Sequence, residues 1–112
     1  MPYNAFLRTL RVRWTLNQEE LAELLGISQG RISRYEGGEE APPLTVALAL
    51  QVIFGIGPRS VFSHLYASVE EAVMRRGAEL ERSLVGKTDY SAIKKRQLLE
   101  AMMARATKRK EA

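Results

Sequence analysis

Apolar residues along the chain recur at spacings of three and four, and the alternating apolar and polar pattern of a strand is nearly absent. This pattern predicts an all-α protein. A first helix is expected after Asn4, a residue that can cap a helix N-terminus, with Phe6, Leu7, Leu10 and Trp14 as candidate buried positions.

Two short helices joined by a very tight turn are expected next. Asn17 and, three residues later, Glu20 form a capping-box-like pair that opens the first of them. Gly26 ends this helix, and Ser28 caps the following one. Because so few residues separate the two helices, they must cross at a steep angle. The positions expected to pack them together are Leu21, Ala22, Leu25, Ile27, Ile32 and Tyr35.

A fourth helix is predicted from Leu44 to Phe54, and its apolar composition marks it as the central core element. Pro43 fits at or just before its first helical position, and Pro58 opens a short fifth helix. These elements predict five successive helices within residues 1–66.

The composition shifts near residue 67. Ser68–Glu71 has the pattern of a capping box that opens a sixth helix, and Gly86–Asp89 is a break before a seventh. Residues 67–112 are therefore predicted to be a helical extension with a basic C-terminal end. Its apolar stripes exceed what the bundle needs, which favours dimerisation.

Charge and composition narrow the possible functions. The net charge of +4 and the pI near 9.7 favour a polyanionic partner. Residues 1–66 hold six Arg and six Glu, so the whole excess lies in residues 67–112. The basic end there is interpreted either as an arm that contacts phosphates or as the solvated face of dimerisation helices.

Several kinds of site are not expected. The chain has no Cys and a single His, His64, so neither a thiolate or His-based metal site nor a catalytic triad is expected. No paired acid and base or phosphate-cradling glycine loop is found, so we expect neither an enzyme nor a cofactor. No apolar run approaches the roughly 18 residues of a membrane span, and the N-terminus lacks signal-peptide blocks. A cytoplasmic location is expected by elimination.

The window from Gln18 to Glu36 meets every physical demand of a helix-turn-helix within about twenty residues. Ala22 is small where the second helix crosses it, Gly26 accepts the turn, and the remaining inward positions are apolar. This window resembles the Cro/phage-repressor (Xre-type) family of DNA-binding proteins. The resemblance covers about residues 4–66 and implies a compact five-helix bundle whose third helix enters the DNA major groove.

The outward face of the third helix is suited to base recognition. With Ile32 and Tyr35 inward, the positions that project outward are polar or glycine and include no acidic residue. Gln can bind adenine, and Arg can bind guanine, through two hydrogen bonds each. In the family the matching positions read bases, which assigns this role to Gln29 and Arg34, with Ser33 in support.

The resemblance also implies contacts with the DNA backbone. Gln18, at the start of the second helix, matches a position that holds a phosphate, and Asn17, Ser28 and Arg31 are candidates for further phosphate contacts. Arg11 and Glu36 match positions that form an internal ion pair in the family. They are therefore assigned a structural role in orienting the recognition helix.

Two features depart from the family pattern. Gly30 stands where relatives often have a base-reading side chain, so one contact per half-site is lost or replaced by close backbone approach. Glu39 and Glu40 stand in a loop where relatives often place basic or polar residues that bind phosphate. Two carboxylates there would repel phosphates unless the loop turns away.

These observations predict a sequence-specific transcriptional regulator that binds double-stranded DNA, most simply a homodimeric repressor on a near-palindromic operator. The alternative is an antitoxin-like interaction module whose C-terminal helices bind a partner protein. The C-terminal apolar stripes and Glu39-Glu40 motivate this alternative.

Overall fold

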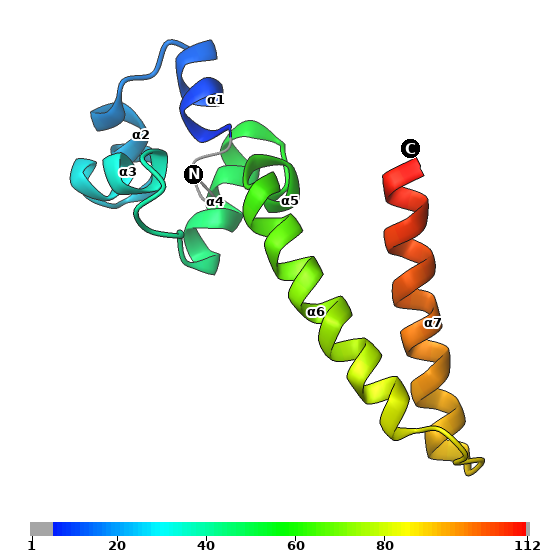
Figure 1. Ribbon diagram of the computed structural model, residues 1–112. Coiled ribbons are helices and arrows are strands. Elements are labelled where there is room, and N and C mark those ends of the chain that lie inside the picture. Colours follow the sequence, from blue (N-terminus) through cyan, green and yellow to red (C-terminus); the bar gives the residue numbers. More distant parts are fainter. Residues whose placement is uncertain (1–5, 112) are drawn as a thin grey trace. The chain divides into compact units, whose positions relative to one another are not determined.

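The computed structural model describes residues 6–111. Helix makes up 76% of the described residues, and none of them lies in a strand, which confirms the predicted all-α fold. The elements, shown in Figure 1, are α1 (Leu7–Arg13), α2 (Gln18–Leu25), α3 (Gln29–Glu36), α4 (Leu44–Phe54), α5 (Pro58–Val61), α6 (Ser63–Ser83) and α7 (Tyr90–Glu111). The chain forms two compact units, one ending at Ser68 and one beginning at Val69.

The first unit is built around one cluster of buried apolar side chains. These side chains come from all of the first five helices and from Phe62, which directly follows α5. The largest that are fully buried are Leu7, Leu21, Ile32, Tyr35, Leu50 and Val61. Burial of this kind is the main stabilising term for a small helical domain.

Helix α1 contributes only Leu7 and Leu10 to this apolar cluster. Phe6 and Trp14, also predicted to be buried, have 52% and 64% of their surface exposed. That prediction was wrong because the helix is shorter than expected. Phe6 and Trp14 are its N-cap and C-cap, so they lie beyond the face that α1 packs on the core. The predicted cap at Asn4 lies outside the described residues.

Helix α4 spans the predicted residues but buries only one of its faces. Val46, Ala47 and Leu50 are buried. Three other apolar side chains, four residues apart along one line of the helix, are exposed. These are Leu44, Leu48 and Val52. The prediction that the whole helix is a central core element was therefore too broad, since a helix packed on one side leaves its other face in solvent.

Helix α6 begins at Ser63, earlier than predicted, and runs through Ser68 without a break. The prediction that Ser68–Glu71 opens a helix was wrong. Neither Gly nor Pro occurs between Pro58 and Gly77, so nothing in this stretch forces a helix to end. A capping-box pattern is compatible with a helix interior when no breaker precedes it.

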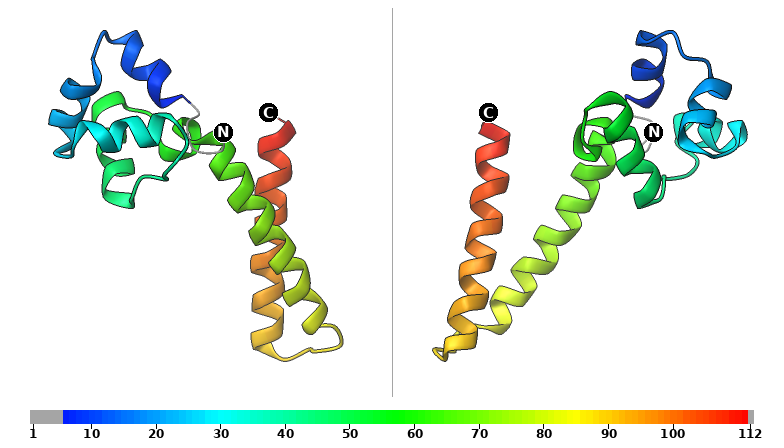
Figure 2. Two further views of the ribbon diagram at one scale, coloured as in Figure 1. Left: turned by 60° about the vertical axis from the view of Figure 1, so that its left-hand side comes forward. Right: turned by 180° about the vertical axis from the view of Figure 1, so that it is seen from behind.

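In the second unit α7 runs back alongside α6 in the antiparallel direction, as the two views of Figure 2 show. The buried cluster of the second unit consists of Leu84, Ala92 and Leu99, and Met102 packs against it. The turn between the helices falls at the predicted break. The Arg96 guanidinium donates to the backbone carbonyls of Leu84 and Lys87, which ties this turn to α7.

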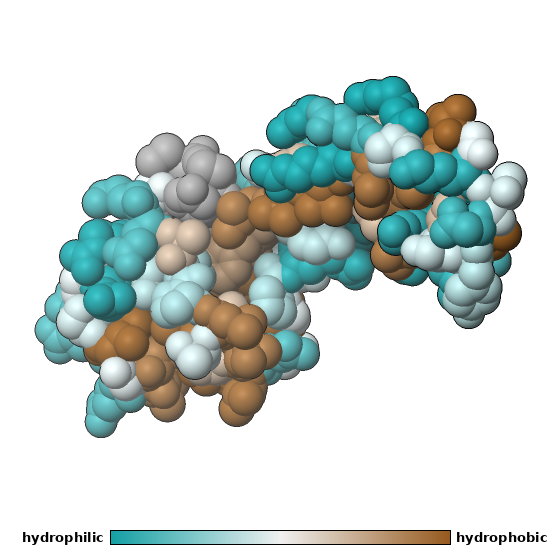
Figure 3. Space-filling view, turned by 90° about the horizontal axis from the view of Figure 1, so that it is seen from below, coloured by the Kyte–Doolittle hydropathy of each residue, from teal (hydrophilic) through white to brown (hydrophobic). Residues whose placement is uncertain are grey.

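Many apolar side chains of the second unit remain in solvent. Figure 3 shows such side chains, in brown, at the surface of the molecule. On α6 they include Val69, Val73 and Leu80, and on α7 they include Tyr90, Ile93, Leu98 and Met103. An ion pair between Glu70 and Arg109 links the two helices far from their turn. Among residues 6–111, no helix has the combination of length and apolarity that a membrane crossing requires.

Candidate nucleic-acid interface

The helix α2 is opened by the predicted capping box. The Asn17 Oδ1 accepts from the Glu20 backbone N–H at 2.8 Å, and the Glu20 carboxylate accepts from the Asn17 backbone N–H at 2.9 Å. Both bonds satisfy amides that a helix N-terminus leaves without partners. Local sequence therefore fixes where α2 begins.

The turn between α2 and α3 depends on two residues. Gly26 has φ +70°, a left-handed conformation that glycine adopts without steric cost. The Ser28 Oγ then accepts from the Arg31 backbone N–H at 3.3 Å and caps α3. Because Ala22, Ile32 and Tyr35 are buried across this turn, the opposite side of α3 faces solvent.

Arg11 of α1 and Glu36 of α3 form a two-bond ion pair below the exposed face of α3. The Arg11 Nε and Nη2 atoms donate to the two carboxylate oxygens of Glu36 at 2.6 and 3.0 Å. A third donor, Nη1, reaches the Leu16 backbone carbonyl at 2.9 Å. Only 10% of the Arg11 side chain and 6% of the Glu36 side chain are exposed. The hydrogen bond to Glu36 raises the pKa of Arg11, against an opposing effect of burial.

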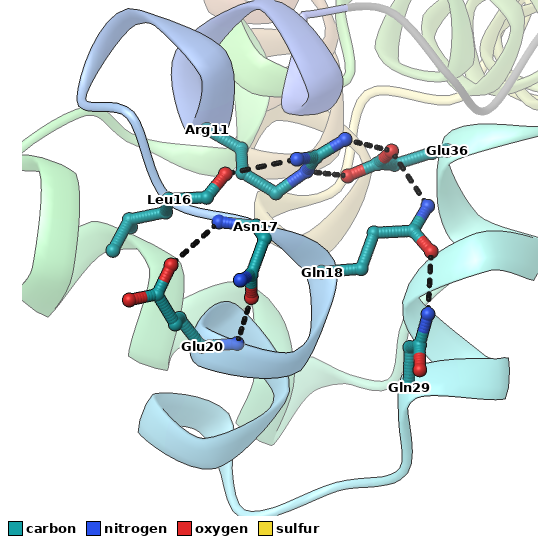
Figure 4. A network of polar contacts seen from close by, with 7 residues as sticks. All are labelled: Arg11, Leu16, Asn17, Gln18, Glu20, Gln29 and Glu36. Atoms are coloured by element: carbon teal, nitrogen blue, oxygen red, sulfur yellow. Dashed lines mark hydrogen bonds and ion pairs between the residues drawn. The ribbon is translucent and has the colours of Figure 1, made fainter.

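Two glutamine side chains extend this ion pair to the surface, as Figure 4 shows. The Gln18 Nε2 donates to the Glu36 Oε1 at 3.2 Å, and the Gln29 Nε2 donates to the Gln18 Oε1 at 3.2 Å. An ionised carboxylate can only accept hydrogen bonds, so the Gln18 NH2 group must face Glu36. The Gln18 oxygen then faces Gln29, which must present its own NH2 group to it. Within residues 6–111, one N–H of Gln29 and its carbonyl oxygen have no hydrogen-bond partner, and these are the two groups that the adenine edge requires.

Arg34 is an exposed basic side chain on α3. Its Nε donates to the Glu40 Oε2 at 2.9 Å, and Arg31 lies 3.7 Å from the other oxygen of the same carboxylate. Nearly half of each arginine side chain is exposed. Sequence reasoning missed this role of Glu40, which it interpreted as a source of repulsion toward phosphates and as support for the partner-protein alternative. Gly38 could have predicted this contact, because a glycine just past the end of a helix often reverses the direction of the chain.

The structure brings the predicted residues together on one side of the first unit. Gln29, Ser33 and Arg34 are exposed on α3, beside Gln18 at the start of α2. The Asn17 and Ser28 oxygens serve as helix caps, which leaves the Asn17 amide N–H groups and the Ser28 hydroxyl hydrogen as donors. Within residues 6–111 no group of three or more acidic or His side chains is placed to hold a metal ion.

The arrangement of α2, a glycine turn and α3 on a helical bundle defines a helix-turn-helix motif. Residues 5–65 match the helix-turn-helix domain family, so the chain belongs to that family. This confirms the resemblance inferred from the sequence. No solved structure matches the chain.

Three proteins illustrate what the chain is similar to. A Pyrococcus furiosus protein, provisionally named HTH-type transcriptional regulatory protein, is 35% identical over 78 residues, 67% of this chain and 24% of that protein. A similarly named Thermococcus kodakarensis protein is 41% identical over 64 residues, 57% of this chain and 20% of that protein. The cryptic phage CTXphi transcriptional repressor RstR of Vibrio cholerae is 29% identical over 69 residues, 62% of each chain. The chain thus spans less than two thirds of the length of each.

Proposed function

We propose that the protein is a transcriptional regulator that binds double-stranded DNA in a sequence-specific manner, with α3 in the major groove. The observation that carries the proposal is the continuous set of bonds from the buried Arg11–Glu36 pair through Gln18 to the exposed Gln29. A surface glutamine held in one orientation by a buried ion pair suits recognition of a base edge. The family match and the names of the relatives support the same function.

Each predicted contact has a defined chemical role in this proposal. Gln29 offers one donor and one acceptor to adenine, Arg34 offers parallel donors to guanine, and Ser33 supports them. Gln18, Asn17, Ser28 and Arg31 face phosphates together with the N-terminal amides of α2. The proposal involves no catalysis and no cofactor.

We further propose that the protein acts as a homodimeric repressor. The exposed apolar side chains of α6 and α7 in the second unit, from Val69 to Met103, are the surface through which two copies associate. A symmetric dimer presents two recognition helices to two half-sites, which explains why such motifs bind near-palindromic DNA. The name of the Vibrio cholerae relative, a repressor, favours repression over activation.

Selection of bound duplexes from a random pool tests the DNA-binding proposal directly. The expected result is an enriched, near-palindromic sequence that contains adenine and guanine at positions reached by α3. The Arg34→Ala variant should bind this sequence more weakly by about 1–3 kcal/mol and lose preference at one base pair. If the wild-type protein enriches no sequence at physiological salt, the proposal fails.

The same surface of the second unit also admits a different protein as its partner, as in the antitoxin-like alternative. Sedimentation of the purified full chain separates the two interpretations. A mass of two chains supports the homodimer. A monomer that forms a stoichiometric complex with one protein from its native host supports the alternative.

A further inference from the structure

The loop after α3 returns an acidic side chain to the exposed face of that helix. The Glu39 backbone N–H bonds the Arg34 carbonyl at 2.9 Å, and the Gly38 N–H bonds the Tyr35 carbonyl at 3.3 Å. These two bonds, with Gly38 at φ +76°, are the Schellman motif that ends a helix and reverses the chain. The reversal places Glu40, six residues after Arg34, beside the Arg34 guanidinium.

Glu40 engages only part of the Arg34 guanidinium. The carboxylate binds Nε at 2.9 Å. The guanidinium has five N–H donors in a fixed plane, so four donors on Nη1 and Nη2 remain for another acceptor. Two of these are parallel and match the O6 and N7 acceptors of guanine.

Gly30 leaves space for the other end of this side chain. A Cβ atom placed on Gly30 would lie 3.8 Å from the Arg34 Nη1. The guanidinium therefore extends along the helix, one turn toward its N-terminus, over the position that has no side chain. Glu40 on one side and the gap at Gly30 on the other define one placement of the Arg34 donors.

We propose that Glu40 is the positioning residue that makes Arg34 specific for guanine, an inference that rests on the proposed DNA-binding function. The ion pair is exposed and therefore weak in the free protein. In a DNA groove, where water is displaced, the same pair is stronger and holds Nε while Nη1 and Nη2 face the base. Arg34 and Arg31 together also neutralise a carboxylate that would otherwise repel the phosphates.

The alternative is that Glu40 only competes with DNA for Arg34. The two interpretations differ in what loss of the carboxylate does to base preference. A competitor lowers affinity for every duplex by the same factor, whereas a positioning residue changes the ratio between duplexes. Glu40→Gln is the matched variant, since its amide oxygen still accepts from Nε but it has no charge.

The experiment measures the affinity of the full chain for two duplexes. One is the sequence selected by the wild-type protein, and the other has A·T in place of the G·C pair whose recognition Arg34→Ala abolishes. The expected discrimination by the wild-type protein is about 5-fold to 100-fold, as for a two-bond arginine contact. Glu40→Ala should reduce this ratio about threefold or more, and Glu40→Gln, which keeps the acceptor but loses the charge, should reduce it less. In the Arg34→Ala background, Glu40→Ala should leave the ratio unchanged.

Three outcomes overturn the proposal. A Glu40→Ala variant with the wild-type ratio, or with both affinities raised by one factor, shows that Glu40 merely competes. If Arg34→Ala keeps the base preference of the wild type, Arg34 does not recognise that base and Glu40 has no such contact to position. If the wild-type protein enriches no sequence, the proposed function fails as well, so the two failures are distinguishable. Circular dichroism of each variant verifies that the fold is kept.

Discussion

Glu36 accepts hydrogen bonds from three donors of two different helices, two from Arg11 and one from Gln18. Its carboxylate is nearly enclosed, so it cannot be replaced by water without cost. Glu36 therefore contributes to the stability of the first unit, through Arg11, and to the orientation of the exposed Gln29 amide, through Gln18.

Removal of the Glu36 carboxylate should strongly destabilise the protein. Glu36→Ala leaves the Arg11 guanidinium buried with only the Leu16 carbonyl as a partner, which we expect to lower the free energy of unfolding by about 3 kcal/mol or more. Arg31→Ala, which breaks an exposed contact, should change it by less than about 1 kcal/mol. Urea unfolding of both variants checks this, and similar losses in both would contradict it.

Tyr35 should tolerate loss of its hydroxyl. The side chain is fully buried, and its oxygen has no hydrogen bond of normal geometry in the part of the chain that the structure describes, although it lies near enough to the exposed Arg31 guanidinium to raise the pKa of Arg31. Tyr35→Phe therefore removes only a weak contact with Arg31, and its free energy of unfolding should stay within about 1 kcal/mol of the wild-type value. Tyr35→Ala, which leaves a cavity, should cost about 3–5 kcal/mol. A loss above about 2 kcal/mol for Tyr35→Phe would show that the hydroxyl is bonded.

At the scale of elements, α6 packs against α7 at a position where α6 has no side chain. A Cβ atom on Gly77 would meet Leu99 and Met102 at 3.5 Å, which is ordinary van der Waals contact. Gly77 therefore costs helix stability without being required for packing.

Gly77→Ala should stabilise the second unit by about 0.5–1 kcal/mol, because alanine restricts the unfolded chain and its methyl group fits. Gly86 is the matched control. It has φ +80°, so Gly86→Ala should destabilise by about 1 kcal/mol although the space around it is open. Thermal unfolding of the two variants compares them. A destabilised Gly77→Ala variant would show that the methyl group does not fit between the two helices.

Elements whose ends have local signals could be predicted from the sequence. Asn17 with Glu20 fixes one end of α2, Gly26 fixes the other, and Ser28 begins α3. The ends of α1 and the start of α6 have no such signal, so Trp14 was wrongly assigned to the core and Ser68 to a helix start. The contact between Glu40 and Arg34 depends on a chain reversal after α3, which apolar spacing does not record.

At the scale of the whole molecule, the periodicity of the sequence predicts which positions are apolar, but it does not predict which of them are buried within the single chain. Leu48 and Val73 lie on apolar stripes, yet both are exposed in the single chain. Charge likewise describes the whole chain and not the site, since residues 1–66 are neutral while α3 presents two arginines. The roles of the site residues toward DNA therefore stay predictions.

The proposed dimer surface can be tested with charged substitutions. Val73→Glu combined with Leu98→Glu should convert a dimer to a monomer without unfolding it, because both side chains are exposed in the single chain. Val52→Glu, at an exposed apolar position of the first unit, is the control and should stay dimeric. Analytical ultracentrifugation measures the mass, and a dimer that survives the double substitution would place the interface elsewhere.

The set of bonds from Arg11 to Gln29 also has an evolutionary consequence. A substitution at position 11 lies away from the outer face of α3, yet it would free Glu36, then Gln18, and finally the Gln29 amide that we propose faces a base. Mutations at positions 11, 18, 29 and 36 should therefore be strongly epistatic. If the proposed function holds, a lineage that acquires a new operator is expected to change these residues as a group, including Arg11 and Glu36, which are assigned no contact with DNA.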